Sequence, residues 1–309
     1  MRILVTGATG FIGKEFVKSL SKTGHQIIIL SRRPAYLVTP RKNISCIQAD
    51  LRDPINPSGL KGVEIVYHLA AELQEPGKMR TVQIEGTTNL LKAAQKAGVR
   101  KWIQLSSIGV YGSRRGTEIS EETKPSPANE YEKTKFASDQ LVAESCREAG
   151  IQYATLRPSN VLGQGMGNQS FFALIDAVRR RRFIHIGPRG ALATYVHVED
   201  VARALVSCEK APNGSIYNLS SDCTWEVLIE RIASLVGVRS PRLRIPALPL
   251  RLVIRALEGH MRLPLNSSRL ASLTNRSRYS SDRIIHELGF SFAKPMPEGI
   301  EDVFGACFK

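Results

Sequence analysis

The chain has 309 residues, 42% of them hydrophobic and 23% charged, and a formal net charge of +15. This composition is typical of a globular protein with a large core and excludes a disordered chain. No apolar run reaches the roughly 18 residues that a spanning helix needs, so no membrane span is expected.

The cysteines and the charge limit the possible partners. The chain has five scattered cysteines without a CxxC pair, Cys46, Cys146, Cys208, Cys223 and Cys307. They favour reduced thiols in a cytoplasm and argue against a metal site.

The positive net charge attracts anions, but no RNA-binding signature occurs. We therefore expect a generally basic surface and no specific nucleic-acid partner. Because Met1 leads directly into a predicted core strand, we also expect no N-terminal signal peptide.

The first fifteen residues combine an apolar run, three glycines and an amphipathic stretch. Residues 3–5 predict a buried strand, and residues 11–20 carry apolar side chains at helical spacing. Gly7 and Gly10 lie between these two segments, and Gly13 lies in the first turn of the predicted helix. A turn without Cβ atoms lets the backbone approach a pyrophosphate, and the helix N-terminus then holds the anion. The pattern predicts a dinucleotide site, with an ordinary strand-to-helix turn as the alternative.

The second predicted strand, residues 26–30, leads into Ser31, Arg32 and Arg33. At this position in a dinucleotide fold, an acidic residue binds the ribose 2′-hydroxyl of NAD, whereas an Arg accommodates the 2′-phosphate of NADP. No acid is nearby, so the sequence favours NADP, with NAD as the alternative. The alternative without a binding role is that the two arginines belong to a solvated basic loop.

Strands and helices then alternate along the chain, which predicts a parallel, doubly wound sheet. The next strands are expected at residues 44–48, 63–69 and 101–105, with a helix at residues 86–97. Asp50 follows the third strand and either accepts from an adenine amino group or caps a helix. Ala70 and Ala71 follow the fourth, where small side chains leave room for a flat cofactor.

A candidate catalytic group follows. A helix is predicted to begin near Tyr131, and Lys135 is four residues further on, so both side chains share one helix face. A cation beside a phenol lowers its pKa from about 10 toward neutrality, which suits a general acid/base. The fifth strand ends upstream in Ser106 and Ser107. A YxxxK pattern alone is common by chance. Its combination with the Ser-Ser strand end and the glycine turn is more specific.

With these motifs the chain resembles an extended short-chain dehydrogenase/reductase of the NAD-dependent epimerase/dehydratase family, and is similar to nucleotide-sugar epimerases. The matching segments occur in the family's order: TGATGFIG at 6–13, DLRD at 50–53, HLAA at 68–71, EGTTNLLKAA at 85–94, SSIGVYG at 106–112, YEKTK at 131–135, LRPSNVLGQG at 156–165 and YVHVEDVA at 195–202.

The resemblance implies that Ser107, Tyr131 and Lys135 are the catalytic triad and that Asn160 binds substrate. Together with the glycine turn and the end of the second strand, it predicts cofactor contacts at Gly7, Gly10, Phe11, Ile12, Gly13, Ser31, Arg32, Asp50, Leu51, Leu69, Ala70, Ala71, Gln83, Tyr131, Lys135 and Pro158. No metal is expected.

Departures from the family pattern narrow the chemistry. Related dehydratases place an Asp-Glu pair where this chain has Ile108 and Gly109, so dehydration is disfavoured. Gln83 replaces the family's usual Asn before the EGT segment. Epimerases commonly carry an Arg at the position of Ala193, so one diphosphate anchor is missing.

The expected architecture is a Rossmann sheet with a smaller, partly interleaved C-terminal substrate lobe. We assign residues 1–165 to the NAD(P)-binding domain, with the sheet completed by about 187–221, and residues 166–186 and 222–309 to the lobe. Two basic segments are ambiguous. Arg179 to Arg182 either end a helix or form an anion site, and residues 244–263 are either a packed lobe helix or a membrane-surface helix.

These observations predict an NAD(P)-dependent epimerase or oxidoreductase acting on a secondary alcohol or ketone, with a nucleotide-activated sugar as the expected substrate. One alternative is an NADPH-dependent reductase of a steroid-like or other apolar ketone. An alternative of another class is a cofactor-binding assembly or RNA-binding protein, which the intact Tyr131 and Lys135 disfavour. A homodimer is possible.

Overall fold

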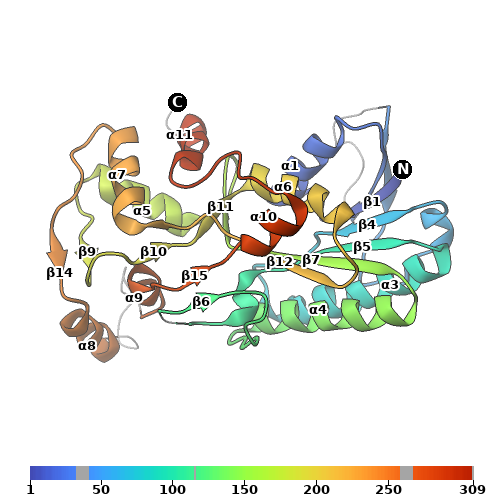
Figure 1. Cartoon of the computed structure of the whole chain (residues 1–309), viewed down its shortest axis with the longest axis horizontal. Coiled ribbons are helices and arrows are strands. Elements are labelled where there is room, and N and C mark those ends of the chain that lie inside the picture. The colour runs from blue at the N-terminus through green and yellow to red at the C-terminus, as the bar shows by residue number, and fades with distance from the viewer. Residues whose placement is uncertain (33–41, 115, 258–266, 308–309) are drawn as a thin grey trace.

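The computed structural model describes residues 1–32, 42–114, 116–257 and 267–307 (Figure 1). Its centre is a seven-stranded sheet in the order β12-β7-β5-β4-β1-β2-β3, with every neighbouring pair parallel. The strands are β1 (Arg2–Thr6), β2 (Gln26–Ser31), β3 (Ile44–Gln48), β4 (Ile65–His68), β5 (Lys101–Leu105), β7 (Gln152–Pro158) and β12 (Ser215–Leu219). The predicted doubly wound parallel sheet is confirmed.

Helices cover both faces of this sheet, as the buried strands of a parallel sheet require (Figure 1). Successive strand residues point to opposite faces, so Ile3 and Val5 join one core while Leu4 joins the other. The first core is closed by α1 (Phe11–Leu20), α6 (Val198–Ser207) and α10 (Asp282–Leu288). The second is closed by α3 (Gly86–Ala97) and α4 (Glu130–Glu148).

Local signals set the ends of the helices nearest the predicted site. Asn129 and Glu132 form a capping box at the N-terminus of α4, where the Asn129 side chain accepts from the Glu132 backbone N–H. Helix α3 ends at Gly98, which adopts the left-handed conformation. Before α3, α2 (Pro76–Arg80) continues into a π-helical turn at Thr81–Glu85.

A third apolar core lies beside the sheet, at the left of Figure 1. It is built from α5 (Gln169–Arg179), α7 (Trp225–Leu235) and α11 (Glu301–Cys307), and a small satellite core joins α8 (Ala247–Leu257) to α9 (Ser267–Thr274). Four short strand pairs connect this region: β6 (Glu118–Ile119) with β15 (Arg278–Tyr279), β8 (Asn160–Leu162) with β11 (Tyr195–His197), β9 (His185–Ile186) with β14 (Arg244–Ile245), and β10 (Leu192–Ala193) with β13 (Cys223–Thr224).

The chain crosses repeatedly between the two regions. Strand β12 joins the main sheet, whereas β11 pairs with β8 outside it. Ile284 and Phe290 fall within the segment we assigned to the lobe, but they pack in the first core of the sheet. The division into two domains remains a prediction.

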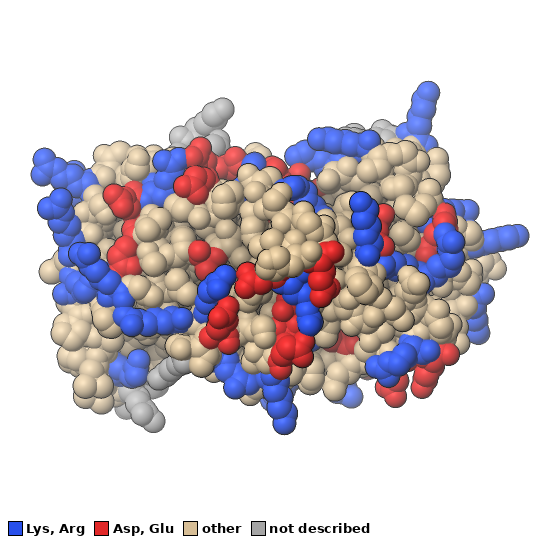
Figure 2. All heavy atoms as spheres, viewed as in Figure 1, with Lys and Arg blue, Asp and Glu red and all other residues tan. Residues whose placement is uncertain are grey.

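Two further findings concern the whole molecule. Lys and Arg side chains are spread over the face shown in Figure 2, with acidic side chains among them. Within the described ranges, no helix is both long enough and apolar enough to cross a bilayer.

Candidate active site

The glycine turn lies at the carboxyl ends of β1 and β4, where the strand order of the sheet reverses. Gly7 has a φ of +69°, and a Cβ there would lie 2.6 Å from the Ala70 backbone nitrogen. A Cβ on Gly13 would lie 2.1 Å from the Gly7 carbonyl oxygen. Only glycine therefore allows the turn to approach β4 and α1 to pack on the turn.

The start of α1 retains free donors. Gly10 is the N-cap residue and provides no side-chain cap, and its own N–H donates to the Gly7 carbonyl at 3.0 Å. The backbone N–H groups of Phe11, Ile12 and Gly13 are first-turn donors without an intrahelical partner. A turn with glycine at its closest approaches, followed by a helix N-terminus, fits the pyrophosphate of a dinucleotide.

Two arginines gather at the end of β2 and β3. Arg52 binds the Asp50 carboxylate through Nη2 at 2.6 Å and Nε at 3.1 Å. This hydrogen bonding lowers the pKa of Asp50, and the charge of exposed Arg32 lowers it further. The Asp50 carboxylate is thus engaged by Arg52 in this structure. Ser31 is half-buried beside them, and Arg33 lies outside the described residues.

The remaining predicted cofactor residues line the strand ends. Leu69 and Pro158 are buried at the ends of β4 and β7, and Leu51 packs against Gly86. Ala70 donates its N–H to the Thr6 hydroxyl at 3.3 Å, and Ala71 is half-buried beside it.

Gln83 is fully buried and bonded within the protein. Its amide Nε2 donates to Thr134 Oγ1 at 2.9 Å, and its Oε1 accepts from the Glu72 N–H at 3.3 Å. It ties the π-helical turn to α4 one residue before Lys135. In this structure Gln83 therefore contacts the helix that carries the predicted triad residues Tyr131 and Lys135.

The predicted triad comes together from β5 and α4. Ser107 caps the short 3-10 turn at Ile108–Tyr111 and accepts from the Gly109 N–H at 3.1 Å. Lys135 is buried, and its Nζ donates to the Leu105 carbonyl at 2.6 Å. Burial lowers the pKa of Lys135 to about 8, although the charge of Asp139 opposes the shift.

The expected effect of Lys135 on Tyr131 is absent. Burial raises the pKa of Tyr131, and the hydrogen-bonding Ser107 side chain is the group that opposes this shift. The Lys135 ammonium is directed to the Leu105 carbonyl at the end of β5. The proposed lowering of the Tyr131 pKa by Lys135 was wrong for the protein alone, because desolvation of the phenol dominates.

A buried charged network that the sequence analysis missed supports the triad. Asp139 Oδ2 accepts from Ser106 Oγ at 2.7 Å and from Arg157 Nε at 3.2 Å. The Arg157 and Asp139 side chains are only 3% and 6% exposed. Arg157 Nη1 also donates to the Tyr111 hydroxyl at 3.0 Å. The network fixes the residue preceding Ser107 and places a carboxylate near Lys135. The sequence did offer one indication of Asp139. It lies four residues after Lys135, so the two side chains share one face of α4.

Several residues predicted on the substrate side are engaged within the protein. Asn160 is exposed on β8, where its Nδ2 donates to the Thr194 carbonyl at 3.0 Å. Ala193 is fully buried. Arg179 and Arg180 each bind the Asp176 carboxylate at 2.7 Å. These ion pairs favour the interpretation of this basic run as a helix end.

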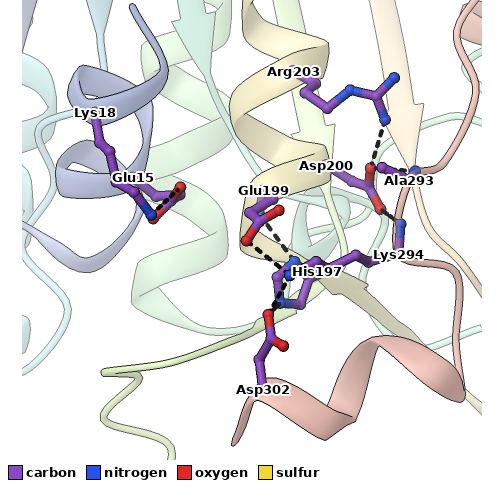
Figure 3. Close-up of polar contacts among 9 residues, drawn as sticks. All are labelled: Glu15, Lys18, His197, Glu199, Asp200, Arg203, Ala293, Lys294 and Asp302. Carbon is purple, nitrogen blue, oxygen red and sulfur yellow. Dashed lines mark hydrogen bonds and ion pairs between the residues drawn. The ribbon is translucent and has the colours of Figure 1, made fainter. Parts of the chain in front are cut away.

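A second polar cluster lies where the C-terminal segment meets α6 (Figure 3). The ligand atoms of His197, Glu199 and Asp302 lie within 4.8 Å of one another. The Lys294 ammonium binds both Glu199, at 2.8 Å, and Asp302. Because the Lys294 ammonium already forms ion pairs with both carboxylates, we interpret the cluster as structural.

The sheet order and the glycine turn at its switch point define an α/β protein of the doubly wound class. The sequence model of the NAD dependent epimerase/dehydratase family matches residues 3–220, and the chain belongs to that family.

The relatives named here include proteins of two substrate classes. The chain is 26% identical to the 3beta-hydroxysteroid-dehydrogenase/decarboxylase isoform 1 of Arabidopsis thaliana, over 96% of this chain and 77% of that protein. It is 30% identical to a putative UDP-glucose 4-epimerase of Methanocaldococcus jannaschii, over 65% of this chain and 71% of that protein. The structure of MoeE5 in complex with UDP-glucose and NAD is similar with a TM-score of 0.75 and 25% identity, covering 99% of this chain and 98% of that one.

Proposed function

We propose that this protein is an NAD(P)-dependent oxidoreductase that interconverts a secondary alcohol and a ketone. The observation that carries the proposal is the convergence of three predicted catalytic side chains at the sheet edge that also carries the glycine turn. Ser107 follows β5, and Lys135 on α4 donates to Leu105, the last residue of β5. Such an edge is where ligands bind in doubly wound folds.

The proposed roles follow from the positions of the side chains. The Tyr131 hydroxyl gives a proton to the substrate oxygen during reduction and takes it back during oxidation. The Ser107 hydroxyl orients the same oxygen by a hydrogen bond. Lys135, fixed on the Leu105 carbonyl, holds a positive charge near the reacting groups when protonated. When bound, a dinucleotide with its pyrophosphate on the glycine turn would supply or accept the hydride through its nicotinamide ring.

For the substrate we favour an uncharged, apolar alcohol or ketone of the hydroxysteroid type. The similarity to the Arabidopsis hydroxysteroid dehydrogenase/decarboxylase extends over 96% of this chain, including the segment assigned to the lobe. Ala193 offers no cation, and Arg179 and Arg180 are paired with Asp176. A diphosphate would need charge-assisted hydrogen bonds that these residues do not provide.

A nucleotide-sugar epimerase is the second candidate. It is supported by the archaeal relative and by MoeE5, which binds UDP-glucose. Here Asn160 would contact the substrate diphosphate after exchanging its bond to the Thr194 carbonyl. An epimerase would return the hydride to the opposite face of a transient ketone.

A thermal-shift and turnover panel separates the two candidates. The cofactor-loaded protein is exposed to hydroxysteroids, to apolar ketones, and to UDP, GDP, dTDP and CDP, because a ligand that binds only the folded state raises its melting temperature. Stabilisation by a steroid, with cofactor-dependent conversion, supports the first candidate. Stabilisation by a nucleotide alone supports the second. Stabilisation by neither, with RNA retained on the protein, would favour the non-enzymatic class.

The cofactor preference is a further proposal. Among the relatives named above, only MoeE5 is described with a bound cofactor, which is NAD. Arg32 is exposed after β2, where a 2′-phosphate would lie, and we expect NADPH to bind several-fold more tightly than NADH. Arg32→Ala should shrink that difference, whereas Arg147→Ala, an exposed change on α4, should leave it unchanged. Equal affinities of the native protein in a fluorescence titration would contradict the preference.

A further inference from the structure

Helix α8 has two apolar faces, only one of which is covered. Ala247, Leu250 and Ile254 pack in the satellite core against α9. At about 100° per residue, the opposite side of the helix carries Leu248, Leu252 and Val253. Pro249 and Ala256 lie on the same side and are also exposed. One continuous apolar arc of α8 therefore faces solvent.

The concentration of exposed apolar side chains here is unusual for this molecule. Of the seven large apolar side chains exposed in the described part of the chain, four lie between residues 243 and 253. Leu243, Leu248, Leu252 and Val253 are 62%, 67%, 64% and 54% exposed. Scattered exposed apolar residues need no explanation, but a contiguous patch marks an interaction surface.

The chain segment that leads into α8 and forms it is basic. Residues 239–257 contain five arginines and no aspartate or glutamate. Arg244 is paired with Glu226, whereas Arg239 and Arg242 are exposed and form no ion pair with any other described residue. Among the described residues on the face shown in Figure 2, no acidic side chain is visible at the lower left end of the molecule, where Figure 1 places α8.

We propose that α8 lies on the surface of an anionic lipid bilayer, with Leu248, Leu252 and Val253 inserted at the level of the head groups and arginines bound to lipid phosphates. An apolar arc flanked by Arg is the pattern of an interfacial helix, whose affinity sums buried apolar area and attraction to anionic lipid. Its 11 residues are too few to span a bilayer. The inference is independent of the substrate proposed above.

Charge argues for lipid rather than a second copy of the chain as the occupant. Two copies would each bring a formal net charge of +15 and the same arginine-rich end to the interface. Like charges on that scale oppose association, whereas an anionic surface attracts them. The arc also lies on the outside of the molecule, at the left end of Figure 1, which a flat surface can reach.

Vesicle flotation of the full chain tests the proposal. We expect the protein to float with vesicles of mixed phosphatidylcholine and phosphatidylglycerol, and to float poorly with phosphatidylcholine alone. Leu248→Ser combined with Leu252→Ser should weaken binding by at least about tenfold. Arg239→Gln combined with Arg242→Gln should weaken binding to the mixed vesicles and reduce its salt dependence. These side chains are exposed, so the variants should keep the native melting temperature.

The matched controls are Val227→Ser on α7 and Leu73→Ser, which remove exposed apolar side chains elsewhere. They should float like the native protein. The proposal would be overturned by no flotation with either vesicle, or by flotation that the Leu248 and Leu252 changes leave intact. It would also be overturned if the native protein failed to bind vesicles and light scattering showed it to be a dimer that the Leu248 and Leu252 changes dissociate. The last result would assign the arc to a second copy.

Discussion

Gly7 occupies a position where no side chain fits, because a Cβ would lie 2.6 Å from the Ala70 nitrogen and the Leu69 carbonyl carbon. We expect Gly7→Ala to lower the free energy of unfolding by about 1–3 kcal/mol, since backbone strain at φ +69° adds to the clash. Cofactor affinity should fall as well, because the turn would move away from β4. Urea unfolding and a cofactor titration measure the two effects.

Gly24→Ala is the control for this change. A Cβ at Gly24 meets nothing within 4 Å and its φ is not in the left-handed region, so stability should change by less than about 0.5 kcal/mol. An equal loss in both variants would mean that the close approach at Gly7 is not the cause.

Tyr131 is the residue on which the proposed chemistry depends. We expect Tyr131→Phe to lower kcat by about 100- to 10,000-fold while cofactor affinity stays nearly native, because a general acid/base acts on the reacting proton and contributes little to ground-state binding. Single-turnover kinetics with a converted substrate measure the first quantity and fluorescence titration the second. Native turnover by the Phe variant would remove the catalytic assignment.

At the scale of elements, periodic apolar runs were sufficient to predict the central sheet. Residues 26–30, 44–48 and 101–105 were predicted as strands and form β2, β3 and β5 within one residue. The fourth strand was predicted at residues 63–69 and is shorter, Ile65–His68. Local sequence was sufficient for β2, β4 and β5 because parallel strands buried on both faces read as largely apolar runs. The edge strand β3 has no fully buried residue and was predicted from its shorter apolar pattern.

Elements held by distant partners were not predictable in the same way. The pairing of β15 with β6 joins residues far apart in sequence. The Asp139–Arg157 pair likewise depends on α4 lying across β7. The predicted triad was accessible from the sequence because Tyr131 and Lys135 lie on one helix, whereas their buried support needed the tertiary structure.

The contact between α6 and the C-terminal segment yields the next prediction. Fully buried Asp200 accepts from the backbone N–H groups of Ala293, at 2.7 Å, and Lys294, at 3.0 Å, and from Arg203 (Figure 3). Asp200→Ala should cost about 3 kcal/mol or more, because it leaves buried donors without a partner. Amides of residues 293–307 should exchange faster with deuterium.

Asp176→Ala provides the comparison, because Asp176 forms its ion pairs with Arg179 and Arg180 at the exposed end of α5. Exposed pairs contribute little, so this change should cost less than about 1 kcal/mol. If the two aspartate variants were equally stable, α6 would not anchor the C-terminal segment as described.

At the scale of the whole molecule, the central sheet carries polar side chains that are buried with it. His68, at the end of β4, is 2% exposed, and its Nδ1 lies 2.8 Å from Thr6 Oγ1 while its Nε2 lies 3.0 Å from Thr87 Oγ1. It therefore connects β1 and β4 to α3 across the strand ends that carry the glycine turn. Any charge placed here would be desolvated, so its protonation is linked to unfolding of the entire sheet.

Burial, together with the charge of Lys135, lowers the pKa of His68 from 6.5 to about 3. Between these values the unfolded chain binds a proton that the folded chain does not, so the free energy of unfolding falls as pH falls below 6.5. This histidine should contribute a slope of up to about 1.4 kcal/mol per pH unit. His68→Gln should have a lower stability at neutral pH but a flatter dependence between pH 5 and 6, measured from urea midpoints. The exposed change His286→Gln should retain the native slope, and a native slope in His68→Gln would show that other groups cause the acid sensitivity.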